Sequence, residues 1–225
     1  MDRLPVTVPE AAGGAEAGAA HAVSGTASEI LQAIRRPGVT LAVWRRTVPA
    51  ALAAFAEGAS AMPPLVRCTV RPAGAAPGLA AALAPVLPGP DFGQRLLVND
   101  LAHLVRLFAD AAGAWSVAVR LERLDTDACR VFHADFVGIR LLCTYAGPGT
   151  QWLPNRSAVR AALGSGDNAA ICPRPDAIRA LPRFAVGLFK GDAWPGNRGN
   201  GIVHRSPPVA GTGQTRLLAC LDIGD

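Results

Sequence analysis

Three residues in the second half of the chain have the types and spacing of metal ligands. His133 and Asp135 lie two residues apart, just ahead of a β-like run, and His204 lies in a second strand-like run, GIVHRSP. On an extended backbone, side chains two residues apart leave the same face. Two imidazoles and one carboxylate can form a facial triad that leaves three neighbouring positions of a non-haem Fe(II) ion open for a co-substrate and O2. The sequence therefore predicts a metal site at His133, Asp135 and His204.

Two arginines and a tyrosine are candidates to hold a co-substrate at this site. Arg216 follows His204 by twelve positions and opens the last strand-like run, and Arg140 lies in the run after Asp135. A guanidinium that faces a protein interior needs an anionic partner, such as the far carboxylate of 2-oxoglutarate. Arg216 is the first candidate for this clamp and Arg140 the second. Tyr145, the only tyrosine, can donate to the same ligand.

Ordinary structural roles are open for each of these residues. His133 and Asp135 can be a surface pair at a strand end, and His204 can be a core histidine bonded to the backbone. Arg216 can form a salt bridge with Asp222, and the ring of Tyr145 can simply pack.

The metal itself also has an alternative. Cys129 or Cys143 can complete a zinc site with the same histidine and aspartate ligands, since thiolates bind zinc well. The protein would then handle metal without catalysis. A third alternative is a structural or partner-binding domain without a metal.

Loops around the predicted site contain further polar and aromatic residues. They are predicted to form a rim that contacts a small-molecule or peptide substrate, although a tryptophan in a loop rich in glycine and proline can equally cover the core. These residues are Trp152, Asn155, Trp194 and Asn197.

The elements that must position these residues change in character along the chain. Residues 1–26 lack periodicity and are predicted to be a flexible tail. Residues 27–114 read mainly as helices, at about 26–37, 49–57, 78–87 and 92–113, with strands at 39–44 and 65–71. Residues 115–225 read as short strands separated by glycine and proline turns, at 115–124, 138–147, 184–194, 201–207 and 215–223. We expect one α+β domain over residues 27–225, whose second half is a sandwich or barrel.

Composition excludes several other classes of protein. The net charge of +5 comes from arginines spread along the chain, with Lys190 as the only lysine, so no basic run favours nucleic acid. The five cysteines contain no C-x-x-C pair, which argues against a zinc ribbon or a disulfide framework. No apolar stretch is long enough to span a bilayer, and the first residues do not resemble a secretory signal. We expect a cytoplasmic protein that does not bind membranes.

The order of the candidate residues resembles that of the Fe(II)/2-oxoglutarate-dependent oxygenases. In that family H-x-D is followed by a long gap, a histidine, and an arginine about ten residues later. The resemblance covers residues 116–223 and implies Fe(II), 2-oxoglutarate as co-substrate, and a cupin-like double-stranded β-helix on which an N-terminal helical layer packs. Many such oxygenases have Ser or Thr two residues after the arginine, where this chain has Leu218.

A closer resemblance is to a bacterial family of unknown function, domain family 1826. The shared motifs are FH-x-D, R-L-x-x-T-Y-x-G-P-G-T-x-W, K-G-x-x-W-P-G-N and V-H-R-S-P, at residues 132–135, 140–152, 190–197 and 203–207. Gln151 stands where the family motif usually has Glu. The family's association with zinc-homeostasis genes implies the metal-handling alternative.

Overall fold

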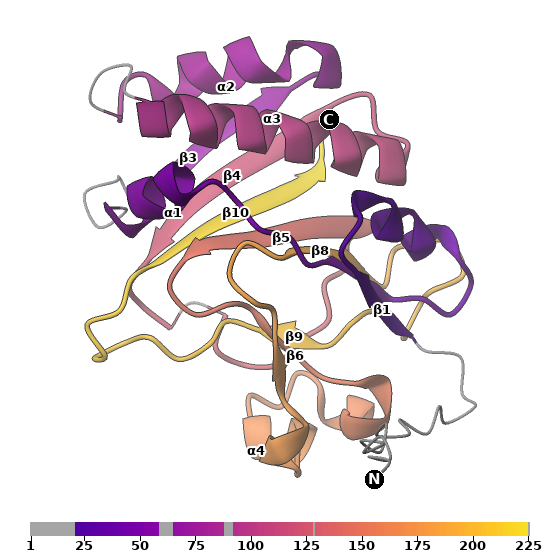
Figure 1. The fold of residues 1–225 in the computed structure, drawn as a ribbon. Coiled ribbons are helices and arrows are strands. Elements are labelled where there is room, and N and C mark those ends of the chain that lie inside the picture. Colours follow the sequence, from indigo (N-terminus) through magenta and orange to yellow (C-terminus); the bar gives the residue numbers. More distant parts are fainter. Residues whose placement is uncertain (1–20, 59–64, 88–91, 128, 225) are drawn as a thin grey trace, which may run out of the picture.

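The computed structural model describes residues 21–58, 65–87, 92–127 and 129–224. Its largest element is a seven-stranded sheet in which every neighbouring pair is antiparallel except β1 and β2 (Figure 1). In spatial order the strands are β1 (Ala22–Gly25), β2 (Leu41–Trp44), β8 (Val186–Lys190), β5 (Ile139–Ala146), β10 (Arg216–Ile223), β4 (Val117–Leu124) and β3 (Leu65–Val70).

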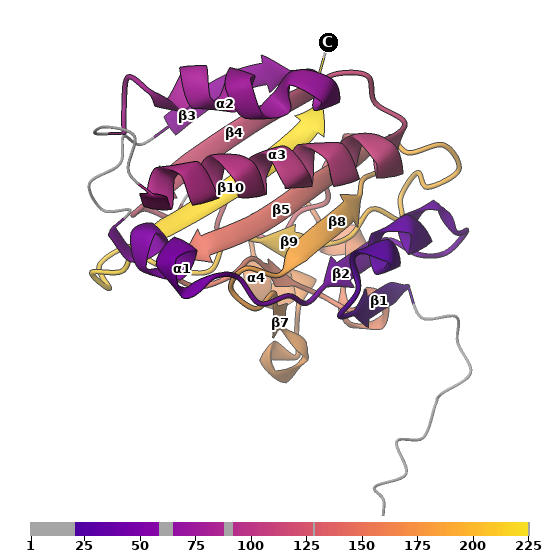
Figure 2. The same cartoon turned by 45° about the horizontal axis from the view of Figure 1, so that its top comes forward.

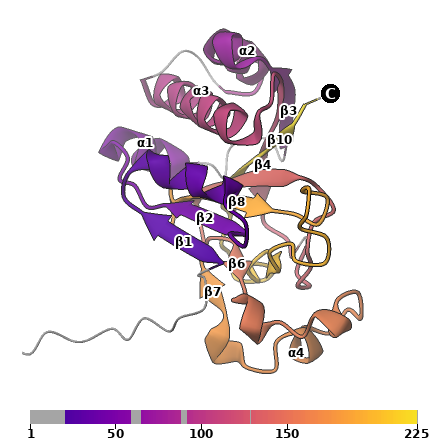
Figure 3. The same ribbon diagram turned by 90° about the vertical axis from the view of Figure 1, so that its right-hand side faces the viewer.

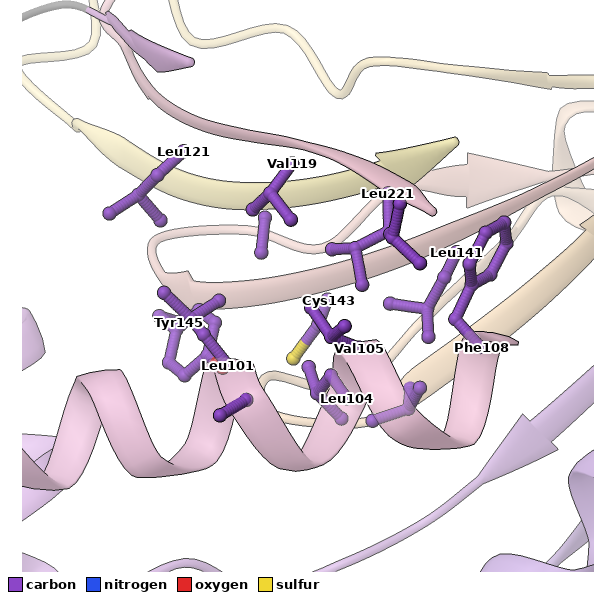
Figure 4. Close-up of a cluster of buried hydrophobic side chains, with 14 of the residues drawn as sticks. Leu101, Leu104, Val105, Phe108, Val119, Leu121, Leu141, Cys143, Tyr145 and Leu221 are labelled. Atoms are coloured by element: carbon purple, nitrogen blue, oxygen red, sulfur yellow. The ribbon is translucent and has the colours of Figure 1, made fainter. Parts of the chain in front are cut away.

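Helices cover one face of this sheet (Figure 2). They are α1 (Ala50–Glu57), α2 (Ala75–Leu83) and α3 (Phe92–Ala112), with the 3-10 helices η1 (Ser28–Arg35) and η3 (Pro72–Gly74). Leu97, Leu101, Leu104 and Phe108 recur along α3 at helical spacing and are all buried. They pack on the apolar residues that alternate along β4, β5 and β10 (Figure 4).

A small sheet of β7 (Arg179–Ala180), β6 (Gln151–Trp152) and β9 (His204–Arg205) lies on the other side of the large sheet (Figure 3). A second apolar cluster, which includes Leu142, Phe189 and Leu218 of the large sheet together with Ile202, fills the space between them. Beyond the small sheet lie α4 (Asn168–Ile171), η4 (Asn155–Ser157), η5 (Arg160–Ala162) and η6 (Pro175–Ala177), which have a small core of their own.

The structure corrects two boundaries predicted from sequence. Residues 22–25 are not part of a tail, because they form β1 and pair with β2; residues 1–20 lie outside the described residues. The division at residues 114 and 115 separates no structural units, because β2 pairs with β8 and β3 pairs with β4. The two halves of the chain therefore contribute strands to one mixed α/β fold.

Among the residues that the structure describes, no helix is both long enough and apolar enough to cross a membrane.

Candidate metal centre

His133, Asp135 and His204 come together as the sequence predicts. Each offers one ligand atom, and these atoms lie within 4.8 Å of one another. His133 Nε2 lies 3.6 Å from Asp135 Oδ1, and His204 Nε2 lies 3.4 Å from Asp135 Oδ2. The backbones of the two histidines exchange hydrogen bonds of 3.0 and 2.9 Å, which extends the small sheet and places both imidazoles side by side.

Backbone carbonyls set the orientation of both rings. His133 Nδ1 lies 2.9 Å from the carbonyl oxygen of Val131, and His204 Nδ1 lies 3.1 Å from that of Ile202. A carbonyl oxygen only accepts, so each Nδ1 carries the proton and each Nε2 keeps a free lone pair. Burial and the neighbouring His204 lower the pKa of His133, which favours the neutral imidazole that a metal requires.

Asp135 is held as a carboxylate. Burial by itself would raise the pKa of Asp135, but the nearby ring of His204 and the positive charge of Arg140 bring it well below its ordinary value. The site thus presents two imidazole Nε2 atoms and one anionic oxygen, a donor set that suits Fe(II) and also Zn(II).

No cysteine joins this group among the described residues. Cys143 is buried, and its thiol donates to the carbonyl oxygen of Phe184. Cys129 lines the same pocket as the triad without belonging to the ligand group. The structure therefore does not support the predicted fourth zinc ligand.

The triad lies in a pocket between the two sheets, with a cavity volume of about 200 Å³. Besides the triad, its lining consists of Arg120, Glu122 and Leu124 of β4, Arg140 and Leu142 of β5, Leu218 and Cys220 of β10, and Cys129, Thr150, Arg205 and Ser206.

Arg216 is almost completely buried and contacts two residues that line this pocket. Its Nε donates to the carbonyl oxygen of Pro148 at 2.8 Å, and its terminal nitrogens donate to Ser206 Oγ at 3.0 Å and Thr150 Oγ1 at 3.2 Å. All three hydrogen-bond partners are neutral. Burial lowers the pKa of Arg216 to about 10, although the negative charge of Glu122 acts in the opposite direction. A buried cation with neutral partners favours an anion beside it. Thr150 and Ser206 contact Arg216 and also line the pocket, so an anion in the pocket could lie close to Arg216.

Arg140 has a different environment from the one predicted. It donates to both oxygens of Asp222, at 2.8 and 2.9 Å, and to Asp135 Oδ2 at 2.7 Å. Because two carboxylates already engage its guanidinium, Arg140 is not a free clamp for a co-substrate. Asp222 pairs with Arg140 and Arg120, not with Arg216.

Tyr145 is not in the pocket. It lies five residues after Arg140 on β5, so its side chain leaves the opposite face of the sheet and packs beneath α3 (Figure 4). Its hydroxyl donates to Asp100 Oδ2 at 2.5 Å. The predicted hydrogen bond from Tyr145 to a co-substrate is therefore wrong.

None of the four predicted rim residues is part of the pocket lining. Trp152 packs against the cluster between the sheets and meets the ring of His21 edge to face. Asn155 bonds with Asn200 and Arg160, and Asn197 is buried and donates to a backbone carbonyl. Trp194 lies under the ammonium group of Lys190, 5.2 Å from it. These residues make contacts within the protein that stabilise loops. The sequence alone could not distinguish this role from contact with a substrate.

Two charged residues of β4 in the pocket lining were not predicted from the sequence. Arg120 and Glu122 alternate with the apolar residues Val119 and Leu121, so the former face the pocket and the latter face α3. This alternation was a usable signal for pocket residues.

Gly149 allows a close approach of two chain segments beside Arg216. A Cβ at Gly149 would lie 1.9 Å from the carbonyl oxygen of Leu181, and both Pro148 and Thr150 bond Arg216. We expect Gly149→Ala to destabilise the fold by about 1–3 kcal/mol or more, measured by urea unfolding. Gly138→Ala is the control, because nothing lies within 4 Å of its added methyl group. Equal stability of the two variants would contradict this account.

His21 should make stability depend on pH. Its Nδ1 pairs with Thr40 Oγ1 at 2.9 Å, and its Nε2 accepts from the backbone N–H of Asn155 at 3.0 Å, which requires a neutral ring. Burial, followed by the charges of Arg160 and Arg156, lowers the pKa of His21. The unfolded chain therefore binds this proton first as pH falls below about 6.5, and stability falls with it.

The measurement is the unfolding free energy in urea at pH 7.5, 6 and 5 for the wild type and His21→Gln. The variant should be the less stable at pH 7.5, and the gap should narrow as pH falls. A gap that stays constant over this range would show that His21 is not the titrating group.

Comparisons with known proteins agree with the motifs. A family model described as "Protein of unknown function (DUF1826)" matches residues 25–222. A search of curated proteins found no match. Among solved structures, the chain is similar to a dioxygenase for auxin oxidation from rice, with 15% identity, a TM-score of 0.46, and coverage of 87% of this chain and 78% of that chain.

It is also similar to the 2-oxoglutarate complex of the dioxygenase for auxin oxidation 1 from Arabidopsis thaliana, with 14% identity, a TM-score of 0.39, and coverage of 72% of this chain and 63% of that chain. A prolyl-4-hydroxylase from Pseudomonas putida is similar as well, with 10% identity, a TM-score of 0.42, and coverage of 88% of this chain and 99% of that chain. The family match spans nearly the whole described chain and includes all three members of the triad, so the protein belongs to the DUF1826 family of proteins of unknown function.

Proposed function

We propose that the protein is a non-haem Fe(II)/2-oxoglutarate-dependent oxygenase. The observation that supports this proposal is that two hydroxyl partners of the buried Arg216 and the residues His133, Asp135 and His204 line one cavity. Arg216 donates hydrogen bonds to Thr150 and Ser206, and these two residues line the same cavity as the triad. The chemistry that Fe(II) supplies in such a site is O2-dependent oxidation of a substrate, coupled to decarboxylation of the 2-oxo acid.

The residues of the chain would divide the work by position. His133, Asp135 and His204 hold the metal, and Arg216 binds the far carboxylate of 2-oxoglutarate. Many such oxygenases have a hydroxyl-bearing residue two positions after the arginine, where this chain has Leu218. Thr150 and Ser206 would supply hydroxyl groups in its place. Leu218 and its neighbours Leu124 and Leu142 line the cavity with apolar surface that limits water.

The proposed fold of the catalytic core is a double-stranded β-helix, with the large and small sheets as its two sides. The apolar cluster between the sheets and the backbone pairing of His133 with His204 support this proposal. The substrate is proposed to be a small molecule or peptide, because the cavity of about 200 Å³ is small. We propose that the protein acts in the cytoplasm.

The test is an anaerobic titration of the metal-free protein with Fe(II) and then 2-oxoglutarate, followed by visible absorption. A metal-to-ligand charge-transfer band is expected for the wild type and should be lost in Asp135→Ala. The surface variant Asp176→Ala serves as the control, because Asp176 lies in an exposed pair with Arg174.

A parallel titration with Zn(II) separates the two functions. If zinc binds tightly, excludes iron and no band forms with 2-oxoglutarate, the oxygenase proposal fails and a metal-handling protein remains.

A further inference from the structure

A row of alternating charges crosses the pocket face of the large sheet and ends at the candidate metal centre. Arg140 forms a salt bridge of 2.7 Å with Asp135 and donates hydrogen bonds of 2.8 and 2.9 Å to Asp222. Asp222 lies 3.5 Å from Arg120, which bonds Glu122 at 2.9 Å. Arg140, Asp222 and Arg120 come from β5, β10 and β4, which are neighbours in the sheet. We call these five residues the charge row.

Asp222 fixes the direction in which Arg140 points. Both carboxylate oxygens of Asp222 accept from Nε and Nη2 of Arg140, which is the two-point contact that holds a guanidinium in one plane. The remaining nitrogen, Nη1, is thereby directed at Asp135 Oδ2. The side chains of Arg140 and Asp222 are 19% and 23% exposed, so water competes little for these contacts.

This contact restrains the metal ligand itself. One side of Asp135 Oδ2 accepts from Arg140, so rotation of the carboxylate would break a charge-assisted hydrogen bond. A carboxylate held in this way offers a metal one oxygen, whereas a freely rotating carboxylate can offer two. A second oxygen from Asp135 would occupy one of the three positions that a facial triad leaves open.

We propose that Arg140, oriented by Asp222, is a positioning residue that makes Asp135 bind the metal through a single oxygen. This inference rests on the proposed function only in taking the triad as a metal site. Asp222 has a second effect, because its negative charge offsets that of Arg140, which would otherwise repel a divalent cation. The pair thus orients Asp135 at little cost in electrostatic repulsion.

The test uses Mn(II) as the probe, with the full chain and without 2-oxoglutarate or a substrate. Titration followed by electron paramagnetic resonance gives the affinity, and water-proton relaxation gives the number of metal-bound waters. The variants are Arg140→Met, Arg140→Lys and Asp222→Asn. Arg183→Met is the matched control, since Arg183 pairs with Glu57 on the surface.

Arg140→Met should weaken Mn(II) binding by about 10–100-fold and lower the bound waters from about three to about two. Arg140→Lys keeps the charge but cannot hold both acids in the same geometry, so it should fall between Arg140→Met and the wild type. Asp222→Asn should change both readouts in the same direction as Arg140→Met and keeps the test usable if Arg140→Met does not fold. Arg183→Met should match the wild type.

Affinity within twofold of the wild type and an unchanged water count in both Arg140→Met and Asp222→Asn would overturn the inference and leave the oxygenase proposal intact. Failure of the wild type to bind Mn(II) at one ion per chain would overturn both.

Discussion

Replacing Arg216 with methionine should weaken 2-oxoglutarate binding by about 100-fold and change Fe(II) affinity by less than about threefold. Among the described residues, the buried guanidinium has three neutral hydrogen-bond partners and only the charge of Glu122 at longer range, so the far carboxylate of the co-substrate would be a directly bonded anion. Charge-assisted bonds to a desolvated carboxylate contribute about 2–5 kcal/mol when one partner is removed. The triad does not contact Arg216 directly, so its metal affinity should persist.

The measurement is calorimetric titration of 2-oxoglutarate into the anaerobic Fe(II) protein, with Arg179→Met as an exposed control. Arg216→Lys should recover part of the affinity, because it restores the charge without the three-point contact. Loss of the hydrogen bonds to Pro148, Ser206 and Thr150 should also cost about 1–3 kcal/mol of stability, which urea unfolding will show. Unchanged 2-oxoglutarate affinity in a folded Arg216→Met protein would rule out Arg216 as the clamp.

Replacing Asp100 with alanine should destabilise the protein by about 3–5 kcal/mol. Asp100 lies on α3 and accepts from both terminal nitrogens of Arg46 and from the hydroxyl of Tyr145. The side chains of Arg46 and Asp100 are 6% and 14% exposed. Without Asp100, Arg46 would remain as a buried charge without its acid, and Tyr145 would lose its acceptor.

Urea unfolding of the wild type, Asp100→Ala and the double variant Arg46→Met/Asp100→Leu checks this prediction. The double variant should be more stable than Asp100→Ala, because it removes the unpaired charge together with its partner. Asp176→Ala, which breaks an exposed pair with side chains 75% and 70% exposed, should change stability by less than about 1 kcal/mol. A loss of similar size in Asp100→Ala and Asp176→Ala would show that the Arg46–Asp100 contact contributes little.

The sequence predicted structure correctly where residue type and short-range spacing pointed to the same element or site. His133 and Asp135 needed only extended backbone to share a face, and His204 followed in a run that does form a strand. The apolar spacing along residues 92–112 predicted α3, because burial of one helical face depends on local order.

Predictions failed where partners lie far apart in the chain. Asp222 and Arg140 are separated by 82 residues, and nothing local indicates that β10 places them side by side. β1 was assigned to a tail, since four residues without a turn signal give no warning of parallel pairing with β2. The error at Tyr145 was avoidable, because alternation along a strand already puts residues 140 and 145 on opposite faces.

The position of β10 has a consequence for how this protein reaches its native state. β10 comes well after β4 and β5 in sequence, yet it lies between these two consecutive strands in the sheet. Until β10 is synthesised, β4 and β5 each present an open edge, and direct pairing between them would compete with the native sheet. The segment between β4 and β5 carries His133 and Asp135, and it must span the width of an intervening strand. The stretch that carries two of the candidate metal ligands therefore also leaves room for β10 between β4 and β5, and changes to its length should impair folding before they affect chemistry.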